Sequence, residues 1–210
     1  MPLRILIADD HAIVCQGFRA LLERAGFDVV GEAADGREAV RLAGELKPDI
    51  ALLDVSMPLT NGLEAGREIQ RANKGTHVVL LTMHAEDHLM AAALRSGIRA
   101  YVLKSQAAED LVLAIRAVMR HQIYLSPGIS KFVVDAYVNG ESAPVDPLAP
   151  RERQVLQLVA EGKTSKEIAV MLGWSTKTAE SYRARVMGKL DIHDTAGLVR
   201  YAIRQGIVQA

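Results

Sequence analysis

The sequence predicts an α/β protein in which a five-stranded, doubly wound parallel sheet is followed by a second, smaller all-α domain. From Leu3 to Gln122, short and continuously apolar runs alternate with amphipathic stretches. Strands that are buried on both faces of a parallel sheet, with helices between them, give this alternation. From Leu148 to Ala210 the pattern is helical throughout, which predicts a small bundle.

Five apolar runs are the expected strands, and five amphipathic runs that follow them are the expected helices. In the first helical run, Val14, Phe18 and Leu22 recur on one face, and Cys15 beside them is expected to be a buried structural thiol. The strands are LRILIAD, DVVGEA, DIALLD, HVVLLT and AYVLK. The helices are IVCQGFRALLERAG, GREAVRLAGELK, LEAGREIQRAN, DHLMAAALRSG and EDLVLAIRAVMRHQ.

A linker is expected between the two domains. A short apolar helical stretch, Ile129 to Val138, precedes NGESAPVDPLAP, which contains three prolines and has no periodicity. We therefore expect a first domain at residues 1–122, a short helix and linker at 123–147, and a second domain at 148–210. Four helical segments make up the second domain: PRERQVLQLVAEG, SKEIAVMLG, STKTAESYRARVMGKLD and TAGLVRYAIRQG.

Composition narrows the class of protein. No apolar run approaches the ~20 residues needed to cross a bilayer, so we expect a cytoplasmic protein without a membrane partner. The chain has 25 basic and 25 acidic residues, but residues 148–210 hold 10 basic and 6 acidic ones. A basic second domain makes a polyanion a candidate partner.

Polar groups stand where the predicted strands end. Asp9 and Asp10 follow the first strand, Asp54 ends the third, Thr82 ends the fourth and Lys104 ends the fifth. These ends meet at one edge of a parallel sheet, where ligands bind in folds of this kind. Three clustered carboxylates repel one another unless a cation lies among them, and oxygen ligands suit Mg²⁺. Lys104 can neutralise further charge and hold a phosphoryl oxygen.

The pattern of polar residues at these strand ends resembles the flavodoxin-like receiver domain of bacterial two-component response regulators. The matching motifs are IADDH, LLDVSMP, LLTMH and AYVLK, in the expected order between Leu3 and about Gln122. The resemblance implies that Asp54 is the nucleophile that takes a phosphoryl group from a sensor histidine kinase. It also implies that Lys104 and a bound Mg²⁺ provide most of the rate enhancement of this phosphoryl transfer, by positioning the reacting groups and neutralising charge.

The resemblance assigns further roles in the same pocket. Asp10, Asp54 and the Ser56 backbone carbonyl would hold Mg²⁺, with Asp9 acting mostly through water. Thr82 would bond a phosphoryl oxygen, and Tyr101 would fill the space behind it as a switch, unless Tyr101 is ordinary strand packing. His84 stands at a position that tunes dephosphorylation in receivers, or is a passive loop residue.

One face of the helix STKTAESYRARVMGKL is suited to DNA. Its apolar positions, Ala179, Tyr182, Val186 and Leu190, are expected to face the bundle. A helix with small residues in front and cations at its margins can enter a major groove, although a solvated charged face is the alternative. The front is formed by Lys177, Glu180, Ser181 and Ala184.

The tail resembles the LuxR-type helix-turn-helix of NarL/FixJ-family response regulators, over LAPRERQVLQLVAEGKTSKEIAVMLGWSTKTAESYRARVMGKLDI. By this resemblance the phosphate contacts are Lys177, Thr178, Arg183, Arg185 and Lys189. The residues facing base edges are Glu180, Ser181 and Ala184; Glu180 replaces a basic residue of other members, and a carboxylate can accept from cytosine N4.

The combined expectation is a DNA-binding transcriptional response regulator rather than a turnover enzyme. Phosphoryl transfer to Asp54 would bias dimerisation, and the dimer would bind a promoter with two half-sites. Two alternatives remain. One is an aspartate-nucleophile phosphohydrolase, although Ser56 stands where such enzymes carry a second aspartate. The other is a DNA binder that acts without phosphorylation.

Overall fold

The computed structural model describes residues 1–210 except 84–89, 91–92, 95, 128–146, 206 and 209–210. The chain divides into two compact units, Met1–Ala143 and Pro144–Ala210. Two expected segments fall largely or wholly outside the described residues: the helix over 87–97 and the short helix from Ile129 to Val138.

The first unit is built on a parallel sheet with the strand order β2-β1-β3-β4-β5-β6. In the part of this unit that the structure describes, five strands lie where the apolar runs predict them, and a sixth, with only two residues, pairs with β5. The sequence did not predict this sixth strand because a run of two residues is too short to show an apolar periodicity. The strands are β1 (Arg4–Ala8), β2 (Asp28–Ala33), β3 (Ile50–Asp54), β4 (His77–Thr82), β5 (Ala100–Leu103) and β6 (Tyr124–Leu125).

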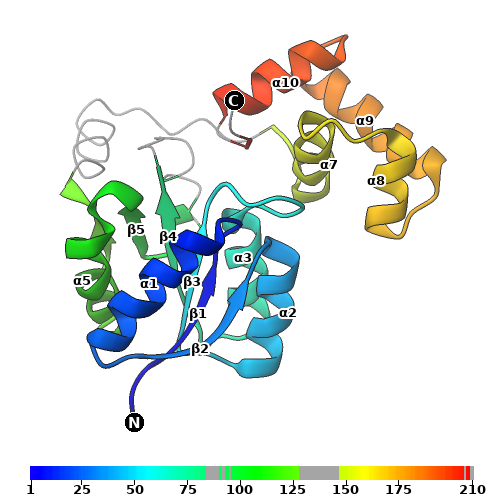
Figure 1. Ribbon diagram of the computed structural model, residues 1–210. Helices are drawn as coiled ribbons and strands as arrows, with labels where there is room; N and C mark the ends of the chain where they lie inside the picture. The colour runs from blue at the N-terminus through cyan, green and yellow to red at the C-terminus, as the bar shows by residue number, and fades with distance from the viewer. Residues whose placement is uncertain (84–89, 91–92, 95, 128–146, 206, 209–210) are drawn as a thin grey trace. The chain divides into compact units, whose positions relative to one another are not determined.

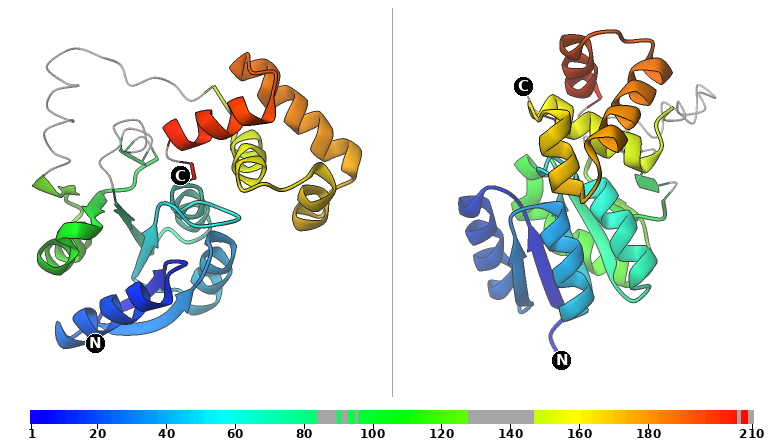
Figure 2. Two further views of the ribbon diagram at one scale, coloured as in Figure 1. Left: turned by 45° about the horizontal axis from the view of Figure 1, so that its top comes forward. Right: turned by 90° about the vertical axis from the view of Figure 1, so that its right-hand side faces the viewer.

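Helices cover both faces of this sheet, which confirms the doubly wound fold. Figure 1 shows α1 (Ala12–Arg24) and α5 (Ala107–Met119) on one face, with α2 (Gly36–Leu46) and α3 (Gly62–Ala72) on the other. Two separate apolar clusters match this arrangement, one containing residues of α1 and α5 and one containing residues of α2 and α3. In the right-hand view of Figure 2, α1 and α3 lie on opposite sides of β1. All five residues of β3 are buried because helices cover both of its faces.

The described residues of the second unit form a bundle of four helices. Side-chain caps begin three of them: the side chains of Thr164, Ser175 and Asp194 accept hydrogen bonds from backbone amides in the following first turn. Gly173, with φ of 69°, ends one helix in the left-handed conformation. The helices are α7 (Pro150–Ala160), α8 (Ser165–Leu172), α9 (Thr176–Leu190) and α10 (Thr195–Arg204).

The bundle has its own apolar core. Val155 and Leu156 of α7, Val186 of α9, and Leu198 and Ala202 of α10 are at most 1% exposed. Helix α7 packs against both α9 and α10, and α8 packs against α9. Among the described residues of the whole chain, no helix is both long enough and apolar enough to traverse a bilayer.

Candidate functional site

The strand register brings the predicted pocket residues to one edge of the sheet. Asp9 directly follows β1, and Asp54 is the last residue of the neighbouring β3. Thr82 ends β4 opposite Leu103, the residue before Lys104. The carboxyl ends of four strands therefore supply the groups that the sequence predicts there.

Lys104 joins two buried carboxylates. Its Nζ lies 2.7 Å from Asp9 Oδ2 and 3.0 Å from Asp54 Oδ1. Asp9 and Asp54 are each 2% exposed, and the Lys104 side chain is 10% exposed. The ammonium is thus held between the two acids and shielded from solvent.

The pKa values of both Asp54 and Lys104 are raised. Burial raises the pKa of the Asp54 carboxyl; Lys104 and a backbone hydrogen bond from Ser56 oppose this rise, and Asp9 adds to it. Burial acts against the charge on Lys104, but Asp54 and Asp9 outweigh it and raise the pKa of the ammonium. Both shifts fit a pocket in which two desolvated carboxylates share one cation.

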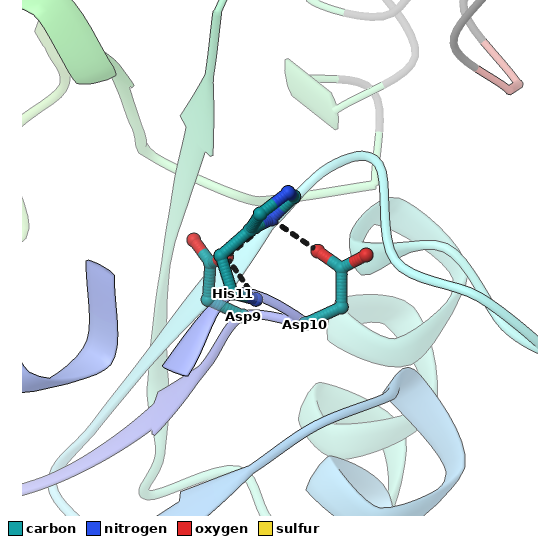
Figure 3. Close-up of side chains that lie close together, drawn as sticks. All are labelled: Asp9, Asp10 and His11. Carbon is teal, nitrogen blue, oxygen red and sulfur yellow. Dashed lines mark hydrogen bonds and ion pairs between the residues drawn. The ribbon is translucent and has the colours of Figure 1, made fainter. Parts of the chain in front are cut away.

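Asp10 turns toward His11. Figure 3 shows the His11 ring between the two neighbouring acids, with Nδ1 2.9 Å from Asp10 Oδ1 and 3.3 Å from Asp9 Oδ1. The His11 backbone amide also donates to Asp9 Oδ1, at 3.0 Å. Asp9, Asp10 and His11 place ligand atoms within 4.8 Å of one another. Asp54 is joined to this group through Lys104.

The pocket suits a hard divalent cation. Asp9, Asp10 and Asp54 bring three carboxylates, and Lys104 neutralises one negative charge. Two of the carboxylates are almost fully buried, where an excess of negative charge is costly unless a cation compensates it. Oxygen donors are the ligands that Mg²⁺ prefers, so the donor set fits this ion.

The loop after β3 holds Asp54 at the edge of the sheet. Met57 is 1% exposed, and Leu59 has a φ of 65°. The Asn61 side chain caps α3 by accepting from the Glu64 amide. Ser56 is half-buried in the turn that follows β3.

The proposed switch residues are buried. Thr82 is 5% exposed and Tyr101, in β5, is 2% exposed. Their roles stay predictions, and His84 lies outside the described residues. Cys15 is 3% exposed and burial raises the pKa of its thiol to about 11, so it is a buried protonated thiol, as expected.

Sequence reasoning did not single out a group of polar residues close to Lys104. The buried Asp110 and Ser126 and the half-buried Tyr124 form a hydrogen-bonded cluster. The signal in the sequence was the run Tyr124-Leu125-Ser126, in which two polar residues flank an apolar one just after the last predicted helix.

The faces of α9 are as the helical periodicity predicts. Ala179 and Val186 are 1% exposed, and Tyr182 and Leu190 are half-buried. Four exposed residues form the front face: Lys177, Glu180, Ser181 and Ala184.

Side chains at the margins of α9 make contacts within the second unit. The Arg183 guanidinium donates to Thr195 Oγ1 at 2.6 Å, and Thr178 shares the cap of the helix with Ser175. Arg185 lies over the Tyr182 ring, 4.8 Å from its centroid. The predicted phosphate-binding side chains are therefore partly ordered by contacts within the unit.

Lys189 is engaged in an ion pair. Its Nζ lies 2.6 Å from Glu152 Oε2 and 3.3 Å from the Pro147 carbonyl oxygen. Its side chain is 44% exposed, so solvent reaches one side of it.

Comparison with known proteins matches both units. Residues 5–116 match the response regulator receiver domain, and residues 146–202 match the bacterial regulatory proteins of the luxR family. Two relatives align with this chain over almost their whole length. The response regulator UvrY of Escherichia coli (strain K12) is 36% identical over 99% of this chain and 97% of its own. The oxygen regulatory protein NreC of Staphylococcus haemolyticus is 35% identical over 98% and 99%.

Solved structures agree with this result. RcsB from Salmonella enterica serovar Typhimurium, bound to promoter P1flhDC in the presence of the phosphomimetic BeF3−, has a TM-score of 0.66 and 30% identity. The match covers 96% of this chain and 98% of that one. A LuxR-family two-component response regulator from Aurantimonas sp. SI85-9A1 has a TM-score of 0.62 and 37% identity over 66% of this chain and 99% of that one.

Fold, strand-end pocket and helical unit together define a response regulator with a receiver domain and a regulatory domain of the luxR type. The chain belongs to the NarL/FixJ family of two-component response regulators.

Proposed function

We propose that this transcriptional response regulator is switched by phosphorylation of Asp54 by a sensor histidine kinase. A carboxylate oxygen of Asp54 attacks the phosphorus of a phosphohistidine. The P–N bond breaks, the imidazole leaves with the electron pair and takes up a proton, and Asp54 becomes an acyl phosphate. The single observation that carries this proposal is the position of Lys104, 3.0 Å from Asp54 at the end of a buried strand.

Lys104 has a defined task in this reaction. Its ammonium already lies beside Asp54 Oδ1, where it can pair with a phosphoryl oxygen while the phosphoryl group is transferred to Asp54. Asp9 holds the same ammonium at 2.7 Å and so orients it. Thr82, at the end of the neighbouring strand, would then donate to the phosphoryl group, with Tyr101 behind it.

Mg²⁺ is the cofactor that the donor set favours. The residues that would hold it are Asp10, Asp54 and the Ser56 backbone carbonyl, with Asp9 acting through water. When bound, Mg²⁺ supplies positive charge against the phosphoryl oxygens.

Labelling with a small phosphodonor tests the reaction without the kinase. The full chain is incubated with acetyl phosphate and Mg²⁺, and intact mass spectrometry follows the gain of one phosphoryl group. The wild type is expected to gain one group, and Asp54→Ala none. Asp28→Ala, which removes an exposed aspartate at the start of β2, is the matched control and should be labelled like the wild type.

Labelling of Asp54→Ala to the wild-type extent would overturn the assignment of the acceptor. Release of inorganic phosphate from small phosphate esters with multiple turnovers would instead favour the phosphohydrolase alternative.

We further propose that phosphorylation promotes a homodimer that binds two half-sites of double-stranded DNA. RcsB, which aligns with 96% of this chain, is bound to promoter DNA in its structure. Here the exposed front face of α9, formed by Lys177, Glu180, Ser181 and Ala184, would enter the major groove. A single helix reads few base pairs, so joining two units on adjacent half-sites raises the effective concentration of the second contact.

Protection mapping on genomic fragments, with and without acetyl phosphate, would find the sites. Duplexes carrying the paired or the single half-site from a protected fragment are then compared. We expect phosphorylation to tighten binding to the pair and to leave the single half-site little changed. Equal tightening on both duplexes would contradict the dimer proposal.

A further inference from the structure

A buried carboxylate lies behind the Lys104 segment. Asp110, in the first turn of α5, is 7% exposed. The Tyr124 hydroxyl donates to its Oδ1 at 2.7 Å, and the Ser126 hydroxyl donates to its Oδ2. Ser126 is completely buried. We call these three residues the Asp110 cluster.

The Asp110 cluster is attached to the end of β5. Ser126 Oγ accepts a hydrogen bond from the Leu103 backbone amide at 3.1 Å. The Ser126 amide donates to the Tyr101 carbonyl, also at 3.1 Å. Ser126 therefore bonds the last residues of β5 twice, once through its own backbone amide and once through its own side chain.

Lys104 stands between the two attachment points. It directly follows Leu103, and it begins the three-residue 3₁₀ helix η1 (Lys104–Gln106), which leads into α5. Ser126 fixes the chain before Lys104, and Asp110 fixes the helix after it. The segment that carries the ammonium is thus tied at both ends to one set of hydrogen bonds.

The chemistry of the cluster is more specific than apolar packing requires. An aspartate at 7% exposure is costly unless its oxygens are paired, and here both accept from hydroxyl groups. Burial and the bond to Asp110 raise the pKa of Tyr124 to about 12, so its hydroxyl remains a donor at neutral pH. Directional bonds of this kind fix a geometry, whereas an apolar contact at the same place would fix only a volume.

We infer that the Asp110 cluster positions the Lys104 ammonium for phosphoryl transfer to Asp54, with Ser126 as the central positioning residue. This inference rests on the proposed function. Its physical basis is that Lys104 has a flexible four-carbon side chain, so the precision of its ammonium depends on how firmly its backbone is held.

A double-mutant cycle on the full chain tests the inference. The rate of acetyl phosphate labelling with Mg²⁺ is measured for wild type, Ser126→Ala, Lys104→Ala and the double variant. We expect Ser126→Ala to lower the rate about fivefold to tenfold, the kinetic equivalent of one lost hydrogen bond. In the Lys104→Ala background the same substitution should change the rate by less than about twofold, because no ammonium is left to position.

Ser105→Ala is the matched control. This substitution also removes one serine hydroxyl, but from an exposed side chain next to Lys104, and the variant should be labelled at the wild-type rate. A Ser126→Ala rate equal to wild type would overturn the inference. So would an equal loss in the Lys104→Ala background, because that result shows a structural effect that does not pass through the lysine.

Two further variants settle the case if Ser126→Ala does not fold. Tyr124→Phe and Asp110→Asn are close to isosteric, and the same cycle with Lys104→Ala applies to each. Failure of the proposed function looks different, because the wild type itself would then carry no phosphoryl group on Asp54.

Discussion

Gly62 shows how a single residue shapes the backbone around Asp54. It is the first residue of α3, and a Cβ atom built on it would lie 2.1 Å from the backbone oxygen of Asp54. Its amide donates to the Val55 carbonyl at 3.0 Å. The start of α3 is therefore pressed against the end of β3, and this contact fixes the backbone that presents the Asp54 carboxylate.

Gly62→Ala should move this backbone and destabilise the first unit by about 1–3 kcal/mol. We also expect slower acetyl phosphate labelling, because Asp54 would shift relative to Lys104. Scanning calorimetry and mass spectrometry measure the two effects.

Gly17→Ala is the control for this change. Gly17 is an exposed position within α1, where an added Cβ meets nothing within 4 Å. Alanine is the better helix former, so this variant should gain up to about 1 kcal/mol. The same loss of stability from both substitutions would refute the contact as the cause.

Lys104 is the cation that two almost fully buried carboxylates, Asp9 and Asp54, share. Its replacement by glutamine leaves Asp9 and Asp54 charged and facing each other in a buried site. The expected cost is about 3–5 kcal/mol in the free energy of unfolding, together with loss of most of the labelling rate. Urea denaturation followed by circular dichroism gives the free energy of unfolding. A cost below about 1 kcal/mol would show that burying Asp9 and Asp54 without the Lys104 ammonium is not strongly unfavourable.

At the scale of elements, one ion pair joins the end of α9 to the start of α7. Glu152, in the first turn of α7 and 4% exposed, bonds Lys189 in the last turn of α9 at 2.6 Å. It also accepts from the Ala149 amide at 2.8 Å. The bond to Lys189, with help from this amide, lowers the pKa of Glu152.

This lowered pKa gives the second unit a pH dependence. A carboxyl with a lower pKa in the folded state contributes stability that is present above its unfolded pKa and is lost as the pH falls through the folded value, below about pH 4. Glu152→Gln should be less stable at neutral pH and should lose less stability on acidification. Glu180→Gln, at an exposed position of α9, is the control and should behave like the wild type.

Trp174 fluorescence measures this effect. Trp174 is the one tryptophan of the chain, and its ring stacks on the Tyr182 ring with 4.8 Å between the ring centroids. Parallel acid-unfolding curves for wild type and Glu152→Gln would show that the pair carries no pH-dependent stability.

The cations of α9 should differ in their effects on DNA binding. Lys177 is exposed on the front of the helix, so Lys177→Ala should weaken DNA binding and reduce the slope of log affinity against log salt by about 1. Lys189→Ala also breaks the bond to Glu152 and should lower the stability of the unit as well. Titrations at several salt concentrations, with Trp174 unfolding curves beside them, separate the two.

At the scale of the molecule, each unit has its own core and should unfold on its own. The apolar clusters of the first unit lie within residues 1–143, and the bundle buries its own apolar residues. Gly62→Ala should therefore lower the calorimetric transition of the first unit while the Trp174 transition stays at its wild-type temperature. A matching fall in the Trp174 transition would show that the two units unfold together.

The sequence by itself determined the repeated strand and helix pattern, the strand ends that carry Asp9, Asp54, Thr82 and Lys104, and the helical tail. These follow from periodicity and from the rule that parallel strands end at one edge, and both are local properties of a sequence. Residues whose spacing is helical, such as Ala179 and Val186, could be assigned to the core for the same reason.

Only the tertiary structure decided which atoms meet. The bond of Lys104 to both Asp9 and Asp54, the turn of Asp10 to His11, and the bond between Glu152 and Lys189 join segments or rotamers that no local pattern specifies. β6 and the Asp110 cluster were missed because two residues have no period and because their partners are distant in sequence. A hydrogen bond depends on distance and direction in space, and these exist only once the chain has packed.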